Sequence, residues 1–191
     1  MLNWGNEDWT TSRRVTKARA LLTPAIQGVG GIWADLGCGD GVFSYLLCAA
    51  LPASSQLYAV DQDQRVLRQL ALNLADRCDN ITLRPTHADF TKPLMLPPLD
   101  GMVMANALHF VQRKAPVLQQ LVTLLKPGAP LVVIEYNARQ GNSAVPYPLP
   151  EDEFLLLAST VSLQKGQIVT RVPSSFLREM YTGIAYARND G

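Results

Sequence analysis

Three glycines at alternate positions form the sequence feature best suited to binding a ligand. They lie in the segment Ala34-Asp-Leu-Gly-Cys-Gly-Asp-Gly41, between a short apolar run and a helix-like pattern. Glycine permits a tight turn and lets a ligand approach the backbone closely. A dinucleotide-binding loop has the spacing G-x-G-x-x-G, and Val42 stands where its last glycine belongs. Asp35 precedes the glycines and would repel a phosphate, so the loop favours a ligand with positive charge and no phosphate.

Polar residues also follow three later apolar runs. Asp61 ends one run and is able to accept hydrogen bonds from both hydroxyls of a ribose. Asp89 follows the next run and can accept from an exocyclic amine, while the adjacent Phe90 can cover a purine ring. Asn106 follows the run after that. Because ligands of doubly wound sheets lie across the carboxyl ends of the strands, we expect these residues and Gly37 to border one pocket.

Several of these residues also have a structural interpretation. The glycines can form an ordinary strand-to-helix turn, Asp61 can cap a helix, and Asp89 can form an Asx turn before Thr91. His109 is a candidate general base because histidine titrates near neutrality, although a structural role is the simpler interpretation. We do not expect Cys38 to act as a nucleophile.

Strand-like and helix-like patterns alternate along the chain. Apolar strand-like runs cover residues 31–36, 56–61, 81–83, 99–105 and 131–135, and helical patterns cover 42–50, 63–74 and 117–125. This order predicts βαβ units and a parallel sheet covered on both faces. The runs 162–170 and 183–188 are joined by too short a link for a parallel crossover, which predicts an antiparallel pair at one edge. A helix is expected from about Thr10 to Leu22.

Composition restricts the class of protein further. The chain has 191 residues, 48% of them hydrophobic, and a formal net charge of +1, which excludes nucleic-acid binding by bulk charge alone. Its three cysteines are odd in number and form no C-x-x-C pair, which argues against a disulfide scaffold or a zinc site and fits a reducing compartment. No apolar run is long enough to span a bilayer, and Glu7 and Asp8 disfavour a secretory signal. We expect a soluble, cytoplasmic protein without a metal site.

With these motifs in view, the sequence resembles the class I S-adenosylmethionine-dependent methyltransferases, and in particular the small-molecule type similar to ubiquinone and menaquinone biosynthesis methyltransferases. The resemblance covers roughly residues 31–135 and rests on Asp35 to Gly41, Asp61, Ala88-Asp89, Ala105 to His109 and Leu125-Lys-Pro-Gly128. It implies an α/β fold with a doubly wound, mostly parallel sheet of seven strands whose last strand is antiparallel. A single methyltransferase domain is expected over residues 1–191.

The resemblance implies S-adenosylmethionine as the cofactor. Gly37 and Gly39 would pack beneath its methionine part, Asp61 would bind the ribose, Asp89 would bind the adenine amine, and Asn106 would lie beside the reacting methyl group. The position after Asp61, which is usually apolar in the family, is Gln62. The expected cofactor-binding residues are Asp35, Gly37, Cys38, Gly39, Asp61, Gln62, Asp89, Phe90 and Asn106.

The implied reaction is in-line transfer of a methyl group to a small-molecule acceptor. Residues 1–28 are expected to form an amino-terminal lid and helix, with Met1 to Trp9 as the lid-like lead, and residues 137–161 an acceptor-side loop and helix. Three alternatives stay open. They are a non-catalytic partner module with this fold, a methyltransferase acting on RNA or protein, and an NAD-dependent oxidoreductase, which the missing glycine disfavours.

Overall fold

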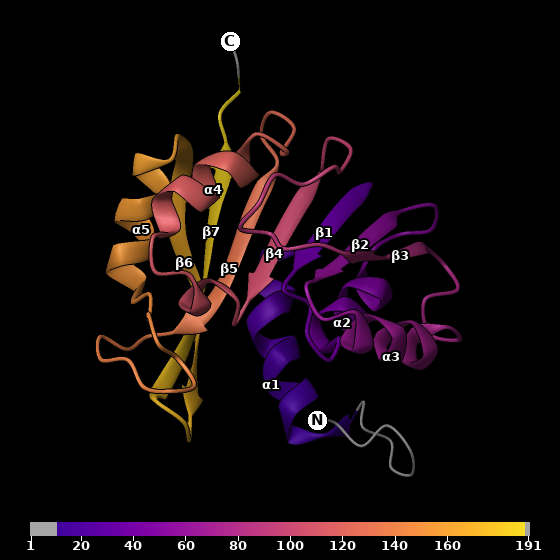
Figure 1. The fold of residues 1–191 in the computed structure, drawn as a ribbon, viewed down its shortest axis with the longest axis horizontal. Helices are drawn as coiled ribbons and strands as arrows, with labels where there is room; N and C mark the ends of the chain where they lie inside the picture. Colours follow the sequence, from indigo (N-terminus) through magenta and orange to yellow (C-terminus); the bar gives the residue numbers. More distant parts are fainter. Residues whose placement is uncertain (1–10, 190–191) are drawn as a thin grey trace.

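Seven strands form one sheet in the spatial order β3-β2-β1-β4-β5-β7-β6 in the computed structural model, which describes residues 11–189 (Figure 1). The strands are β1 (Ile32–Leu36), β2 (Gln56–Asp61), β3 (Thr82–His87), β4 (Gly101–Ala105), β5 (Pro130–Tyr136), β6 (Leu163–Ser174) and β7 (Arg178–Ala187). β1 to β5 are parallel, and β7 lies antiparallel to both β5 and β6. The predicted doubly wound sheet with an antiparallel last strand is confirmed.

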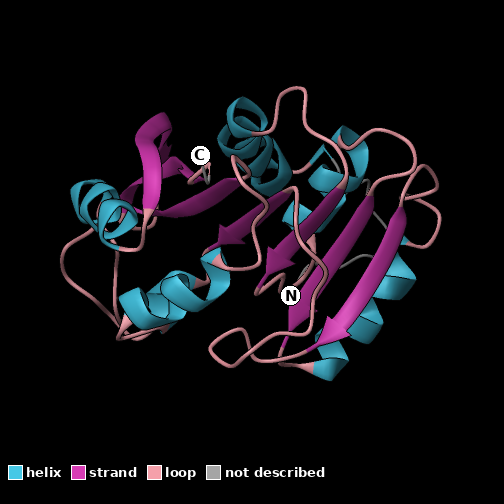
Figure 2. Ribbon diagram, turned by 90° about the horizontal axis from the view of Figure 1, so that it is seen from above, coloured by secondary structure: helices cyan, strands magenta, loops and turns pink. Residues whose placement is uncertain are grey.

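The helices cover both faces of this sheet (Figure 2). One face carries α1 (Arg13–Leu22), α2 (Val42–Ala50) and α3 (Gln64–Leu74), and the other carries α4 (Lys114–Val122) and α5 (Glu151–Thr160). Alternation along β1 shows how each face is filled, because Trp33 packs in the first layer whereas Ala34 and Leu36 pack in the second. The sheet is therefore buried on both sides, as its continuous apolar strands predicted.

Local sequence signals set most element boundaries. Ser12 caps α1 by accepting from the Val15 amide, and Asp63 caps α3 by accepting from the Arg65 amide. The predicted α1 therefore starts at Arg13 rather than Thr10, which lies outside the described residues together with the lead Met1 to Trp9.

Several boundaries differ from the sequence prediction: α4 begins at Lys114, β4 begins at Gly101, β6 extends to Ser174 and β7 begins at Arg178. α4 ends at Val122 and not at Leu125, because Leu125 forms a parallel β-bridge with Leu99. β3 continues to His87, where it pairs with Asp61 at the end of β2. β3 is the edge strand, and its mixture of exposed and half-buried side chains has no apolar pattern.

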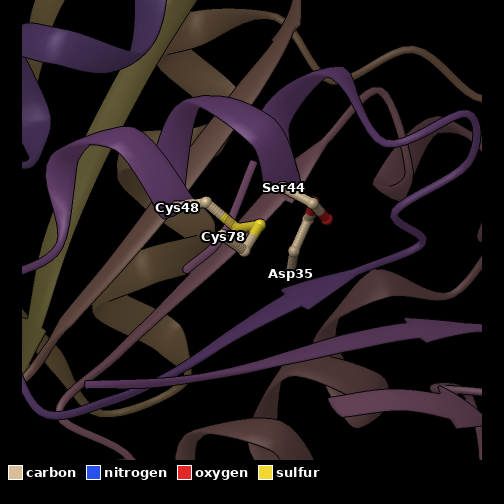
Figure 3. The surroundings of a disulfide bond; sticks show 4 residues. All are labelled: Asp35, Ser44, Cys48 and Cys78. Carbon is tan, nitrogen blue, oxygen red and sulfur yellow. A yellow bond between two sulfur atoms is a disulfide. The ribbon is translucent and has the colours of Figure 1, made fainter. Parts of the chain in front are cut away.

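The expectation of unpaired cysteines is wrong. Cys48 at the end of α2 and Cys78 after α3 form a disulfide across a separation of 30 residues (Figure 3). The two segments are neighbours on one face of the sheet, and a Cα–Cα distance of 5.1 Å suits a disulfide. Cys38 is free and buried. Sequence spacing could not reveal this pair because only the packing of α2 and α3 brings the thiols together.

Two kinds of feature are absent from residues 11–189. No cluster of three or more His, Cys, Asp or Glu side chains in this part of the chain could hold a metal ion. None of the helices described is both long and apolar enough to cross a membrane.

Candidate functional site

A cavity of about 660 Å³ opens at the carboxyl ends of β1, β2 and β4. Of the residues that the sequence assigned to the cofactor, only Asp35 does not line this cavity. The residues that do line it are Gly37, Cys38, Gly39, Asp61, Gln62, Asp89, Phe90 and Asn106. The volume lies within the range of small-molecule sites. The strand ends of the sheet thus bring together residues as far apart in the chain as Gly37 and Asn106.

The glycine loop forms one wall of this cavity. The Gly37 and Cys38 amides both donate to the Val60 carbonyl, at 2.8 and 3.0 Å, and so tie the loop to β2. Gly37 has a φ of +73°, and a Cβ added there would lie 2.8 Å from the Ala107 side chain. Only glycine meets both conditions, and its missing side chain leaves room where the loop approaches the β4 end.

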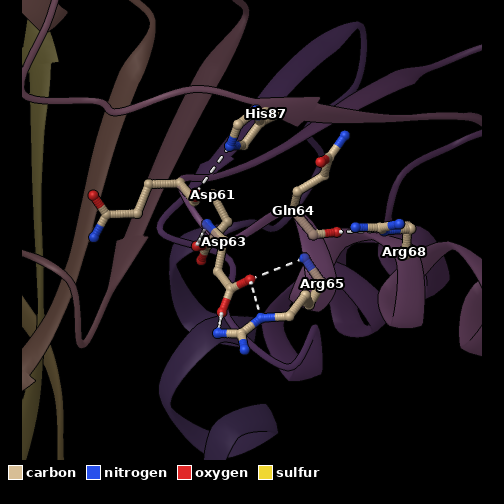
Figure 4. A network of polar contacts seen from close by, with 7 residues as sticks. Asp61, Asp63, Gln64, Arg65, Arg68 and His87 are labelled. Atoms are coloured by element: carbon tan, nitrogen blue, oxygen red, sulfur yellow. Dashed lines mark hydrogen bonds and ion pairs between the residues drawn. The ribbon is translucent and has the colours of Figure 1, made fainter.

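Asp61 is fixed by the backbone on both of its oxygens. Oδ2 accepts from the Gly39 amide at 2.9 Å. Oδ1 accepts from the amide of Asp63, also at 2.9 Å, and Figure 4 shows these two aspartates side by side. A carboxylate has about four acceptor positions, so it can accept further bonds from a ligand in the cavity. The helix cap belongs to Asp63, which makes the cap interpretation of Asp61 wrong. Asp61 instead couples the glycine loop to the start of α3.

Gln62 and Asp89 also line the cavity and have local hydrogen bonds of their own. The Gln62 carbonyl accepts from Nε2 of His87 at 3.0 Å (Figure 4). Asp89 Oδ1 accepts from the Thr91 amide at 2.9 Å and from its hydroxyl at 2.6 Å, which is the Asx turn considered from the sequence. The Thr91 hydroxyl in particular lowers the pKa of Asp89. Both of these bonds use Oδ1, and Oδ2 makes no hydrogen bond within residues 11–189.

Asp35 does not line the cavity. Its side chain is 1% exposed and accepts a hydrogen bond from the Ser44 hydroxyl of α2 at 2.7 Å (Figure 3). Burial, together with the charges of Asp61 and Asp40, raises its pKa from 3.8 to about 7. Alternation along β1 turns this residue toward α2 and away from the cavity.

A second cavity of about 540 Å³ adjoins the first and shares Arg14, Phe43 and Asn106 with it. Its other walls come from α1, the start of α2, β5, the end of β6, β7 and the turn between β6 and β7. They include Arg13, Lys17, Ala18, Leu21, Tyr136, Pro173, Ser174, Ser175, Phe176 and Met180. No residue from 137 to 161 lines either cavity, although the sequence assigned that segment to the acceptor side.

Asn106 lies where the two cavities meet. Its φ of +53° is a left-handed conformation that asparagine tolerates better than most residues. Its Oδ1 is buried and has no hydrogen-bond partner among the described residues. A buried acceptor without a partner is costly, so this oxygen is suited to a donor on a bound ligand.

Comparison with known proteins agrees with this arrangement. The profile of a family described as "Methyltransferase domain" matches residues 34–131, just over half of the chain. The chain belongs to this methyltransferase family. The predicted resemblance to methyltransferases is confirmed, while the ubiquinone-like subtype stays a prediction. No curated protein gives a significant match.

Solved structures similar to this methyltransferase include the N-methyltransferase NodS from Bradyrhizobium japonicum WM9 in complex with S-adenosyl-l-homocysteine. It is 18% identical, with 96% of this chain and 94% of that chain covered and a TM-score of 0.68. A SAM-dependent methyltransferase from Aquifex aeolicus is 17% identical, with 91% of this chain and 96% of that chain covered and a TM-score of 0.66. The CurJ carbon methyltransferase is 17% identical with a TM-score of 0.66, and 85% of this chain spans only 50% of it. At these identities the likeness establishes the fold alone.

His109 of this methyltransferase lines neither cavity. It is 3% exposed, and its ring centroid lies 4.4 Å from that of Phe110 and 6.3 Å from that of Tyr136. Its Nδ1 lies 2.7 Å from Oε2 of the fully buried Glu135, and its backbone amide donates to Oε1 at 3.1 Å. Glu135 therefore anchors the loop after β4 that carries Asn106.

Sequence reasoning missed Glu135 and the residues that β5, β6 and β7 contribute to the second cavity, although it did predict an amino-terminal lid and helix over residues 1–28. Glu135 carried a usable signal, since it is an acid inside the strongly apolar β5 and a buried carboxylate needs a partner. Lys17 and Ser174, which form a hydrogen bond of 3.1 Å, are 157 positions apart and carried no such signal.

Proposed function

We propose that this methyltransferase transfers the methyl group of S-adenosylmethionine to a small-molecule acceptor by in-line displacement. The observation that carries the proposal is the junction of two cavities at Asn106, whose buried Oδ1 lacks a partner among the described residues. The first cavity would hold the cofactor and the second the acceptor. Two reactants held in adjoining compartments meet the requirement for orientation that dominates a displacement reaction.

The residues of the first cavity fit this cofactor. Its acidic lining residues are Asp40, Asp61 and Asp89, and its one basic residue within the described chain, Arg14, is paired with Asp40. This balance suits the sulfonium and amino groups of S-adenosylmethionine and disfavours a diphosphate, which weakens the NAD alternative. The space left by Gly37 would receive the methionine part, Asp61 would accept from the ribose, and Asp89 Oδ2 would accept from the adenine amine.

When bound, the cofactor supplies an activated methyl group that an acceptor nucleophile attacks from the side opposite sulfur, which leaves S-adenosylhomocysteine. The chain's own part is positional. Asn106 would accept from the amino group of the methionine part, and the loop after β4 would separate the reacting centre from water. We propose that His109 positions this loop through Glu135 and is not the general base, because it lines neither cavity.

A calorimetric titration tests the cofactor assignment. S-adenosylhomocysteine should bind with one site per chain, and NAD should not bind at a comparable concentration. Binding of NAD in place of S-adenosylhomocysteine would refute the proposal. If S-adenosylhomocysteine binds but no methyl transfer from labelled S-adenosylmethionine to a broad panel of small molecules occurs, the non-catalytic alternative is favoured.

The class of partner and the location remain proposals as well. The volume of the second cavity, about 540 Å³, supports a small molecule over nucleic acid or a protein surface. A cytoplasmic location is opposed by one feature, the Cys48–Cys78 disulfide, because the cytosol keeps most thiols reduced.

A further inference from the structure

We infer that the methyl acceptor is an anionic small molecule with an apolar, planar body, and that Lys17 and Arg13 bind its anionic group. This inference rests on the proposed function, since it takes the second cavity as the acceptor site. It goes beyond that function because it assigns a chemical class to the acceptor.

The charge of the second cavity is the first argument. Its charged lining residues are Arg13, Arg14 and Lys17, and among the described residues no aspartate or glutamate lines it. Arg14 is compensated, because its guanidinium donates to Asp40 at 2.8 Å. The half-buried ammonium of Lys17 donates to the Ser174 hydroxyl at 3.1 Å, and no carboxylate of the described chain forms an ion pair with it. Cations that line a cavity without a carboxylate favour an anionic ligand.

The position of these cations is the second argument. Arg13 and Lys17 line only the second cavity, whereas Asn106 and Phe43 line both. An anionic group held by Arg13 and Lys17 therefore stays out of the cofactor cavity, whose carboxylates would repel it. The rest of the acceptor is free to reach the junction at Asn106, where methyl transfer would take place.

The aromatic walls define the body of the acceptor. Tyr136 and Phe176 pack edge to face with their ring centroids 5.4 Å apart, and Phe43 and Met180 complete the apolar lining. Phe176 remains 42% exposed, although it lies in the turn between β6 and β7 and faces a cavity. Aromatic and thioether side chains favour contact with a planar apolar group.

The test uses matched probes on the complex with S-adenosylhomocysteine. The anionic probe is the carboxylate 4-phenylbutanoate. Its two controls, the neutral 4-phenylbutanamide and the cationic 4-phenylbutylamine, have the same apolar body and differ from it only in the head group. Ligand-observed NMR titrations should give the tightest binding for the carboxylate and the weakest for the amine. Phenyl phosphate provides a second anion, and tighter binding of one of the two shows which anionic group the cavity prefers.

Substitution of Lys17 identifies the source of this preference. Lys17→Gln should weaken 4-phenylbutanoate binding by roughly three- to tenfold, the value of one partly exposed charge contact, and leave the amide unchanged. Arg19→Gln is the matched control, because Arg19 lies on the same helix and does not line this cavity. Arg13→Gln, at an exposed position, serves as the second variant if Lys17→Gln does not fold.

The outcomes separate the inference from the proposed function. If the wild-type protein does not bind S-adenosylhomocysteine, the proposed function fails. If it binds S-adenosylhomocysteine but holds the amide or the amine as tightly as both anions, the inferred acceptor class is refuted and the proposed function stands. An anion preference that Lys17→Gln and Arg13→Gln both leave intact would likewise overturn the assignment of these residues.

Discussion

Removal of the Asp61 carboxylate should weaken S-adenosylhomocysteine binding and lower stability at the same time. The carboxylate accepts from the Gly39 and Asp63 amides, each at 2.9 Å, and would also accept from the two ribose hydroxyls. Asp61→Ala removes all four interactions. Asp61→Asn keeps the shape, but its amide NH₂ must face one of the two backbone N–H groups, so one internal hydrogen bond is lost and two donors oppose each other.

The structure sets the size of these effects. Each internal bond is charge-assisted but only partly buried, so we take about 1 kcal/mol for each, and the loss of about 2 kcal/mol corresponds to a fall in Tm of roughly 4–8 °C at this chain length. Two ribose contacts at about 1.5 kcal/mol each give about 3 kcal/mol, or a Kd roughly 100-fold weaker for Asp61→Ala. Asp61→Asn should lie between the wild type and Asp61→Ala in affinity.

Calorimetry with S-adenosylhomocysteine and thermal unfolding of the same samples provide the measurements. Asp63→Ala is the control, because Asp63 caps α3 and does not line the cavity. It should lower Tm slightly and leave the Kd within about twofold of the wild-type value. The reasoning is refuted if Asp61→Ala lowers Tm but keeps the wild-type affinity, since Asp61 would then be a purely structural link between the glycine loop and α3.

Three further predictions concern groups beneath the site. Because burial raises the Asp35 pKa from 3.8 to about 7, its neutral form stabilises the fold at low pH, and roughly 4 kcal/mol at most is lost as the pH rises from about 4 to 7; Asp35→Asn should flatten this part of a plot of Tm against pH. Under denaturing, non-reducing conditions one thiol should react rather than three, and Cys48→Ser should cost about 3 kcal/mol of stability, since the disulfide spans 30 residues; three reactive thiols would contradict this. Glu135→Gln should cost about 1–3 kcal/mol and also weaken S-adenosylhomocysteine binding, because Glu135 holds the loop at His109; an unchanged Kd would show that the loop keeps its place without it.

The bounds of α2 and β2 were predictable to the residue from local signals. α2 lies over Val42–Ala50, between the glycines and Pro52, and β2 lies over Gln56–Asp61, as expected. The extent of β3 was not predictable, because this edge strand is specified by its pairing with β2 rather than by an apolar pattern. The end of α4 was missed for a similar reason, since the bridge between Leu99 and Leu125 is a long-range contact.

The two cavities also differ in how far their lining residues could be predicted from the sequence. The first is built at strand ends, and the topology of a doubly wound sheet requires those ends to converge, so motif positions alone gave its lining. Asp35 is the exception, because in a strand of alternating side chains a single position decides between the ligand and the α2 face. The second cavity depends on how α1 packs against the hairpin of β6 and β7, and no local pattern encodes that contact.

The basic cluster at the start of α1 gains its roles from this packing. Arg14 binds Asp40 of the glycine loop, and Lys17 binds Ser174 near the hairpin turn. Thr182 of β7 adds a buried bond to the Leu21 carbonyl at 2.8 Å, which fixes the far end of the helix. Exposed ion pairs contribute little to stability, so the main effect of the Arg14–Asp40 pair is to connect α1 to the glycine loop. One helix thus borders both cavities, and its Arg14 lines each of them.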